Sequence, residues 1–541
     1  MSGWFDLLVC QNVLVAKGYR PVVRDQEFLL PPNMADWLGE DHLVWFVLDV
    51  VAELDTSALH ASRRTGGVGR AGYDPDMLVA LMIYAYATGQ RSSRRIEQLC
   101  VDHVAFRVLC AQDPPDHSTI ARFRAAHDGV FVDLFAQVLR LCAEAGHVQV
   151  ATIAIDGTKI AANASTSANR SHAWVREQAR AIAQQALDEA TAVDAAEDAA
   201  ETAAGGPRRP PEQLRTRAGR AAAIKKAMEE IARQDAAHQA ADAADRQVQE
   251  DYLRRVEAGE AVPGRPPAGV DEVRLHQARL VREQQRLTLV ADARGTAATS
   301  QRSAIRRAIT KAQAALDGAI AAQAVGGADR RGAAARERDR DQARRGPAGG
   351  PRVNLTDPQT RIMVEGSGGG TVQGYNSQIV CSDDHFVIGV HVSQDANDTH
   401  CWTPALAAAT TQLEPLGKTI GVVLADNGYF TEANLTSAGP ARLIAPGKSR
   451  QVHHDAMHHP AAGPPPPGLS PADRMRHTLR TPEHARRYKR RSATVEPTIG
   501  RLKDRIGLRR FARRGLDAVT AELNLAAAAL NITRLHHATT A

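Results

Sequence analysis

Two aspartates in the sequence follow apolar stretches with the composition of β-strands. Asp156 comes after the run VQVATIAI, and Asp426 comes after the run IGVVLA. Glycine follows each of them within two positions, so a turn at the end of a strand accounts for either residue alone. The end of a rigid strand also suits a metal-binding carboxylate, because the strand fixes the ligand geometry. Asp156 and Asp426 are therefore candidate ligands of one site.

A third candidate, Glu496, lies in a strongly basic stretch. Between positions 486 and 514 the only acidic residues are Glu496 and Asp504, among many lysines and arginines. An isolated carboxylate in such a stretch suits a site beside DNA phosphates, which the cations neutralise. The alternatives are a surface ion pair for Glu496 and a basic helix that touches nucleic acid nonspecifically.

Together the three carboxylates predict metal-dependent phosphodiester chemistry. Mg²⁺ and Mn²⁺ prefer oxygen ligands, and phosphodiester cleavage often uses two such ions. We expect Asp156 to bridge two ions, with Asp426 and Glu496 each holding one. Lys503 follows Glu496 by seven residues, which is two helical turns, and so shares its face if the helix is continuous.

The first elements that could position these residues are helical. We predict an N-terminal extension at 1–25 and a helix-turn-helix-like DNA-binding domain at 26–147, with helices within 41–54, 74–89, 92–110 and 114–146. Asp74 is the expected N-cap of the second helix, with Pro75 in its first turn. An ordinary helical bundle with a basic surface is the alternative. The arginines predicted to contact DNA near helix starts are Arg94, Arg95, Arg122 and Arg124.

Residues 170–350 are predicted as a helical insertion. Ala, Arg, Glu, Gln and Asp dominate this segment, and large apolar residues are few, which favours long solvated helices. Heptads are not sustained, so a coiled coil is not specifically indicated. Gripping DNA ends, joining protomers and acting as a passive spacer remain alternative roles.

The remaining elements predict an α/β core at 148–169 and 351–535. Strand patterns occur around Asp156, on both sides of the turn SDD, before Asp426 and at 441–448, with helices between and after them. This order is that of a ribonuclease-H-like mixed sheet flanked by helices. Within the core, residues 451–485 are predicted as a flexible His/Pro-rich loop. Their histidines lack the ligand spacing of a zinc site.

Several motifs carry a resemblance to a known family. They are QEFLLPPNMADWLGEDHLVWFVLDVVAELD, YDPDMLVALMIYAYATGQRSSRRIEQLC and PPDHSTIARFRAAH in the helical part, and IDGTKIAANAS, NLTDPQTRIM, GYNSQIV, LADNGYF and VEPTIGRLK in the core. With these motifs in this order, the chain resembles the DDE transposases of bacterial insertion sequences, most closely the family IS eleven-eighty-two. The resemblance covers most of the chain outside the insertion.

The resemblance implies that Asp156, Asp426 and Glu496 are the metal-binding triad. It also implies cleavage at transposon ends, followed by attack of the freed 3′-hydroxyl on target DNA. The partners would be double-stranded DNA, as terminal inverted repeats and target, and further copies of the chain in a homodimer or larger complex. An inactive or domesticated DNA-binding derivative, a ribonuclease-H-like nuclease without strand transfer, and a helical scaffold built on the insertion are the alternatives.

The family pattern Y-x2-R-x3-E-x6-K implies DNA contacts around Glu496. Lys503 has the expected spacing, and Tyr488 and Arg491 fit each other. Arg491, however, precedes Glu496 by one residue more than the pattern requires, which on a continuous helix turns it about 100° away from the Glu496 face. Arg501, in the same basic stretch, is a further predicted DNA contact.

Composition sets the remaining bounds. A length of 541 residues is enough for two to four domains, and the formal net charge of +6 is modest. The six cysteines are scattered without a CxxC pair, which favours a reducing, cytoplasmic location over a disulfide framework. No apolar run reaches the roughly 18 residues of a membrane span, and no secretory leader is recognised, so no membrane partner is expected.

Overall fold

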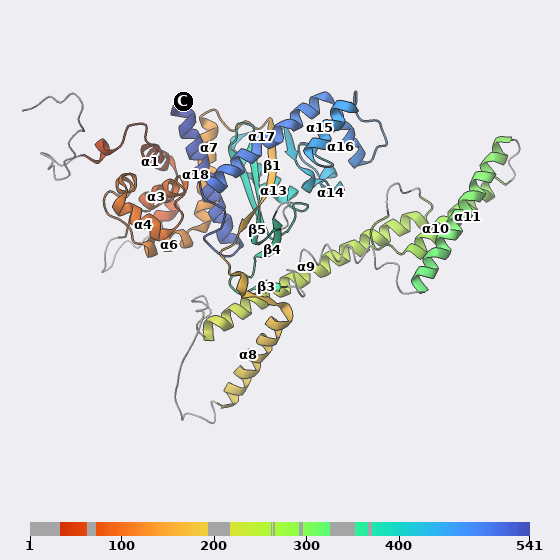
Figure 1. The fold of residues 1–541 in the computed structure, drawn as a ribbon, viewed down its shortest axis with the longest axis horizontal. Coiled ribbons are helices and arrows are strands. Elements are labelled where there is room, and N and C mark those ends of the chain that lie inside the picture. Colours follow the sequence, from red (N-terminus) through yellow and green to blue (C-terminus); the bar gives the residue numbers. More distant parts are fainter. Residues whose placement is uncertain are drawn as a thin grey trace, which may run out of the picture.

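The computed structural model shows a mixed α/β fold with three visible parts (Figure 1). It describes residues 33–61, 72–192, 217–260, 262, 266–291, 296–324, 352–365 and 370–540. Helices gather at the N-terminal side, a sheet with its own helices forms the centre, and a long helical arm extends away from both. The predicted extension at 1–25 lies outside the described residues. No helix in the described ranges is both long and apolar enough to span a membrane.

The N-terminal helices pack around one fully buried helix, α3. Every residue of α3 from Leu78 to Ala87 is buried, so this helix is apolar on all sides rather than amphipathic. It contacts α1 and also the last helix of the chain, α18 (Leu516–Thr540), which in turn packs on α7. The bounds are η1 Met34–Trp37, α1 Leu43–Glu53, α2 Ser57–Ala61, α3 Pro75–Ala87, α4 Ser93–Asp102, α5 Val104–Leu109, α6 His117–Ala126 and α7 Asp128–Glu144.

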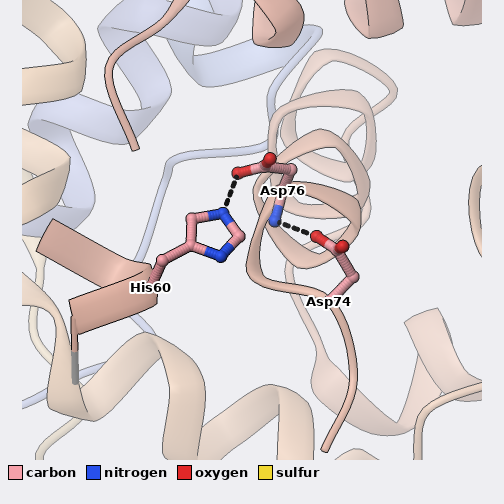
Figure 2. A group of neighbouring side chains, drawn as sticks. All are labelled: His60, Asp74 and Asp76. Atoms are coloured by element: carbon pink, nitrogen blue, oxygen red, sulfur yellow. Dashed lines mark hydrogen bonds and ion pairs between the residues drawn. The ribbon is translucent and has the colours of Figure 1, made fainter. Parts of the chain in front are cut away.

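Asp74 caps α3 as predicted, and Pro75 occupies its first turn. The Asp74 carboxylate accepts hydrogen bonds from the backbone N–H groups of Asp76 and Met77, at 2.7 and 3.3 Å. The Asp76 carboxylate pairs with His60 at 3.1 Å (Figure 2). These contacts tie the start of α3 to α2.

The central sheet has six strands, and five of them follow the order β4-β5-β1-β7-β8, while β6 also pairs with β5. β1 runs antiparallel to β5 and parallel to β7, and β7 runs parallel to β8. The long strand β5 is antiparallel to β4 and to β6. The strands are β1 Thr152–Ala161, β4 Arg361–Glu365, β5 Gly370–Ser382, β6 Val387–Ser393, β7 Val422–Ala425 and β8 Ala441–Ile444.

Helices cover the sheet and continue its hydrophobic core. α13 packs on β5 and β6, α17 contacts β1, β5 and β7, and α18 contacts β6. Because α18 touches both the sheet and the N-terminal helices, the two regions share one continuous core. The bounds are α13 Trp402–Leu413, η5 Glu414–Leu416, η6 Asn427–Tyr429, α14 Glu432–Thr436, α15 Ser449–His458, α16 Pro471–Arg480 and α17 Pro482–Asp504.

The segment predicted as an insertion leaves the core after β1. A two-stranded sheet of β2 (Asn169–Ser171) and β3 (Arg352–Asn354) forms its base, with η2 (Thr166–Ala168) just before. Its helices are α8 His172–Ala192, α9 Arg217–Glu257, α10 Glu272–Leu289 and α11 Thr296–Ala324. We call α9, α10 and α11 the arm. Figure 1 shows α9 running outward from the core to the paired helices α10 and α11.

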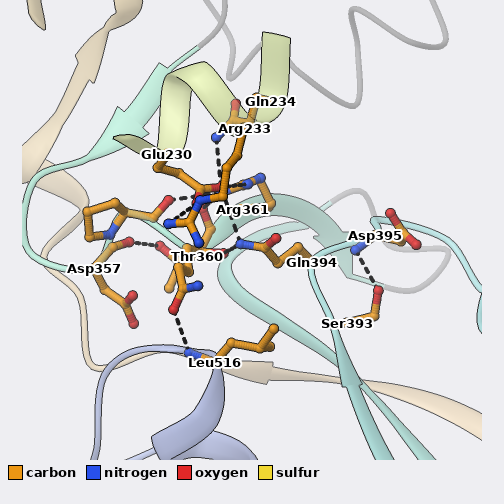
Figure 3. Close-up of polar contacts among 12 residues, drawn as sticks. Glu230, Arg233, Gln234, Asp357, Thr360, Arg361, Ser393, Gln394, Asp395 and Leu516 are labelled. Atoms are coloured by element: carbon orange, nitrogen blue, oxygen red, sulfur yellow. Dashed lines mark hydrogen bonds and ion pairs between the residues drawn. The ribbon is translucent and has the colours of Figure 1, made fainter. Parts of the chain in front are cut away.

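One buried carboxylate fastens the arm to the core. Glu230 of α9 is 2% exposed, and its carboxylate accepts a hydrogen bond from the Arg361 guanidinium of β4 (Figure 3). Arg233 pairs with the same carboxylate at 3.1 Å, and the Gln394 side chain lies 3.4 Å from it while donating to the Gln359 carbonyl. The core therefore holds the inner end of α9 in a defined position.

Four local predictions were wrong. The helix predicted within 114–146 is two helices, α6 and α7, separated at His127. The helix predicted at 92–110 is two helices, because His103 has an extended backbone and α5 then turns Phe106 onto Tyr84, with ring centroids 5.2 Å apart. The predicted loop at 451–485 contains α15 and α16, which bury Val452 and Leu479. Strand β1 continues through Asp156 to Ala161 instead of ending there, because β5 pairs with it along that whole length.

Candidate active site

Neighbouring parallel strands bring the two aspartates to the same level. In the register of β1 and β7, Ala154 pairs with Leu424, so Asp156 and Asp426 lie two positions further along the two chains. Adjacent strands are about 4.8 Å apart, and residues at the same level of a parallel pair point to the same face. The predicted pair therefore meets on one face of the sheet.

Asp426 is held by the turn that ends β7. Its carboxylate caps the short helix η6 and accepts a hydrogen bond from the Gly428 N–H at 2.9 Å. The turn explanation for this residue is thus correct, but one carboxylate oxygen in a cap leaves the other available. The residue combines a structural role with a place in the site.

Glu496 of helix α17 is linked to Asp156 by Arg491, which lies on the same helix. The Arg491 guanidinium lies 3.1 Å from Asp156 Oδ2 and 3.2 Å from Glu496 Oε1, forming ion pairs with both. Its side chain is 9% exposed, whereas the Glu496 side chain is 57% exposed. The site therefore combines a buried guanidinium, that of Arg491, with a solvent-accessible carboxylate, that of Glu496.

The prediction that Arg491 would point away from Glu496 was wrong. The long side chain reaches the carboxylate although the two residues are five positions apart. Pro497 stands within α17 directly after Glu496, and a proline removes one backbone hydrogen bond from the helix at that turn. The length of the arginine side chain thus allows a contact that the helical positions alone do not predict.

Burial and like charges make the aspartates hard to ionise. The pKa of Asp156 is raised to about 6, chiefly by burial; Arg491 opposes the rise, and the nearby Asp426 and Asp398 add to it. Burial likewise raises the pKa of Asp426, with Asp398 adding to the effect, while the Gly428 N–H, Arg491 and Lys159 lower it. A divalent cation at this point would relieve the repulsion among the carboxylates.

A fourth carboxylate beside the site, Asp398, is not predicted from the sequence. Its Oδ1 accepts hydrogen bonds from the side-chain amides of Asn376 at 2.8 Å and Gln378 at 2.7 Å, both on β5. A Cβ on Gly157 would clash with Asp398 Oδ1, and one on Gly428 would lie 3.2 Å from Oδ2. The glycines after Asp156 and Asp426 therefore make room for Asp398.

No sequence pattern marks Asp398 as a site residue. It lies in the stretch DANDTH between β6 and α13, without an apolar strand before it. The available signal was indirect. Gly157 and Gly428 were assigned only to turns, although a glycine beside a charged residue also permits a close approach of another side chain.

The donor set fits a hard divalent cation. Asp156, Asp426, Glu496 and Asp398 offer carboxylate oxygens, which Mg²⁺ and Mn²⁺ prefer. Among the described residues, the group of at least three potential ligand atoms within 4.8 Å of one another is His60, Asp74 and Asp76. No three of the four site carboxylates are that close together. Figure 2 shows His60, Asp74 and Asp76 engaged in a helix cap and an ion pair, which account for their proximity.

The residues predicted to contact DNA divide into exposed and buried sets. Arg94, Arg95, Arg122 and Arg501 are exposed, and Lys503 is half-buried. Arg124 is 9% exposed and donates to the Arg91 carbonyl at 2.8 Å and to Ser93 at 3.2 Å, so this prediction is corrected: Arg124 holds the helical region together. Tyr488 is 1% exposed and Arg491 faces the carboxylates, which places both inside the site rather than on an outer DNA surface.

Comparison with known families identifies a class for two regions of the chain. Residues 32–126 match the family model Transposase domain (DUF772), and residues 469–536 match the model Transposase DDE domain. The first match covers most of the N-terminal helices, and the second includes Glu496 and most of α17 and α18. No curated protein and no solved structure gives a significant match. Both family matches support a transposase function, and the second suggests a nucleotidyl-transferring enzyme of the DDE class.

Proposed function

We propose that the chain is a transposase of the IS eleven-eighty-two-like type, which cleaves DNA at transposon ends and transfers the cut strand into target DNA. The observation that supports this most directly is the meeting of Asp156, Asp426 and Glu496 from two neighbouring strands and α17. The strand order β6-β5-β1-β7-β8, with the first three antiparallel and the last two parallel to β1, is that expected of a ribonuclease-H-like core.

In this proposal Asp156, Asp426 and Glu496 hold two Mg²⁺ or Mn²⁺ ions. When bound, these ions supply activation of a water or 3′-hydroxyl and stabilisation of the leaving oxygen. Arg491 keeps the carboxylates of Asp156 and Glu496 oriented toward one point while the site is empty of substrate. Asp398 positions the turn of Asp426 through Gln378, whose side-chain oxygen accepts a hydrogen bond from Tyr429 of η6.

DNA would reach this site along the basic surface of α17. Arg501 and Lys503 are proposed phosphate contacts there, and the exposed Arg94, Arg95 and Arg122 of α4 and α6 are proposed contacts of the N-terminal helices with terminal repeats. Action as a homodimer or larger complex and a cytoplasmic location remain predictions from the sequence.

Supercoiled plasmid carrying the DNA that flanks the gene provides the test. With Mg²⁺ or Mn²⁺, the wild-type chain should nick at the element ends and join the 3′ ends to a second plasmid. Cleavage without joining would favour a nuclease, and binding without nicking would favour an inactive derivative. If deletion of the arm abolishes function while Asp156→Ala leaves it intact, the scaffold explanation is correct instead.

A further inference from the structure

A cavity of about 540 Å³ lies where the ends of α17 and α18 meet the β5–β6 turn. Its lining includes none of the four carboxylates of the candidate active site. We call it the basic cavity. Arg501 of α17, Arg505 just after it, and Arg534 and His537 of α18 line it. Phe386 and Leu530, both buried, supply apolar lining. With His147, which also lines it, five basic side chains surround this cavity.

Their positive charge is largely uncompensated. Arg501 forms no ion pair with a carboxylate anywhere in the described ranges, and the Arg505 guanidinium donates to His537 Nε2 at 3.3 Å rather than to an acid. Burial and then Arg505, His536 and Arg501 lower the pKa of His537; burial and then Arg501 lower the pKa of Arg534, which Asp384 only partly opposes. The cations therefore repel one another across the cavity.

The one acidic residue in the cavity lining is already engaged. The Asp384 carboxylate accepts hydrogen bonds from the backbone N–H groups of Val148 and Gln149, both at 2.9 Å, and from the Ser382 hydroxyl at 2.6 Å. His147 lies 3.7 Å from it. A carboxylate with this many donors is a poor counter-ion for the arginines, so the arginines remain available to an external anion.

One of the arginines is fixed in place. Arg534 Nε donates to the Asp384 carbonyl at 2.6 Å, and its guanidinium lies over the Phe386 ring, 5.4 Å from the centroid. A guanidinium held in this way loses little freedom when it binds a planar array of anionic oxygens. The cavity is thus partly organised before any ligand binds.

We propose that the basic cavity binds a backbone phosphate of duplex DNA. This inference rests on the proposed function, because it assumes that DNA lies along α17. Arg501 follows Glu496 by five residues, which is about 7.5 Å along the helix axis and about 140° around it, so α17 carries the accessible carboxylate and the phosphate contact on different sides of one helix. A phosphate held here would fix the position of the DNA relative to the three carboxylates.

Binding of a fluorescent 40-base-pair duplex, measured by anisotropy over a KCl series without divalent cations, tests the proposal. Arg501→Gln should lower the slope of log affinity against log salt by about 1, and Arg501→Gln with Arg505→Gln by about 2, because each removed cation releases one counterion fewer. At about 0.15 M salt, the double variant should bind at least ten-fold more weakly. Arg501→Lys keeps the charge and should keep the slope.

Arg286→Gln on the arm is the matched control, since that arginine pairs with Glu283 at 2.8 Å and its charge is already compensated. Its salt slope should equal that of the wild type. An unchanged slope in the Arg501 and Arg505 variants, with a wild-type melting temperature, would overturn the proposal. That outcome is separable from failure of the proposed function, in which the wild type binds duplex DNA yet never nicks it with Mg²⁺.

Discussion

The candidate active site and the arm both contain an arginine paired with two carboxylates, but that arginine is buried in the site and exposed on the arm. On the arm, Arg274 pairs with Glu250 at 3.0 Å and Glu257 at 2.9 Å, and its side chain is 41% exposed. In the site, Arg491 pairs with Asp156 and Glu496 at similar distances, but its side chain is only 9% exposed. Water and salt screen the first set of charges, whereas burial leaves the second set strongly coupled.

Burial, and not the residue types, distinguishes the charge cluster of the candidate site from the solvated ion pairs of the arm. In the candidate site, burial raises the pKa of Asp156 to about 6. Buried carboxylates that repel one another in this way are typical of sites where a bound cation supplies the compensating positive charge.

The largest expected effect comes from removing one carboxylate of the site. Asp156→Asn keeps the size of the side chain but loses the negative charge that would hold a cation, so nicking of supercoiled plasmid should fall at least 10³-fold. Glu257→Gln, which removes an arm carboxylate, should leave the nicking rate within about two-fold. Equal rates in the wild type and Asp156→Asn would remove the distinction between the two regions.

The junction between the two regions should give the next largest effect, on stability. Glu230→Ala leaves Arg361 without its buried carboxylate, and breaking a buried ion pair costs about 3–5 kcal/mol. We expect protease sensitivity near α9 and a lower free energy of unfolding, measured by urea denaturation. Glu250→Ala is the matched control on the exposed part of the arm, and equal losses in the two variants would contradict the role of burial.

The pH dependence of stability tests the buried charge directly. The folded pKa of Asp156 is about 6, above the ordinary 3.8, so the folded state binds this proton more tightly than the unfolded state does. The stability from this group is fully present below about pH 4 and is lost as the pH rises through 6. Relative to the wild type, Asp156→Asn should therefore gain about 2–3 kcal/mol in urea unfolding between pH 4 and pH 7 in EDTA. A constant difference would show that Asp156 is not perturbed.

Sequence patterns located Asp426 well and Asp156 incompletely. The apolar run before Asp426 ends in a turn, and local residues decide that turn. The end of β1 depends instead on pairing with β5, which lies more than two hundred residues later in the chain. Local composition carries no information about such a partner, so the sequence indicated the residue but placed it wrongly within its strand.

Sequence periodicity could not predict two features of the site. Arg491 reaches both Asp156 and Glu496 because its side chain is long enough to span positions that helical spacing sets apart. Asp398 enters through a loop and is held by amides from β5, so only the folded sheet brings it to the aspartates. Helices α15 and α16 were missed for another reason, since prolines and histidines masked a Ser470 cap and a buried Leu479.

A smaller effect is expected from Asp398. Asp398→Asn keeps the shape and an acceptor oxygen for Asn376 and Gln378 but removes the negative charge, and loss of a residue that orients metal ligands typically reduces metal affinity about 10–100-fold. Calorimetric titration with Mn²⁺ should show this loss, and the Asp156 contribution to the pH dependence of stability should shrink. An unchanged Mn²⁺ affinity together with a lower melting temperature would leave Asp398 only a structural role.

The smallest effect is expected where charges are most numerous and most exposed. Arg274→Gln removes a residue with hydrogen bonds to both Glu250 and Glu257, yet these groups are 41–58% exposed, and surface pairs of this kind contribute little to stability because water screens them. The urea midpoint of the variant should therefore stay close to that of the wild type, and the difference should shrink further in KCl because salt screens exposed charges. A larger, salt-independent loss would mean that the arm depends on its ion pairs as strongly as the core depends on Glu230, and the contrast between the two regions would then lie in geometry rather than in exposure.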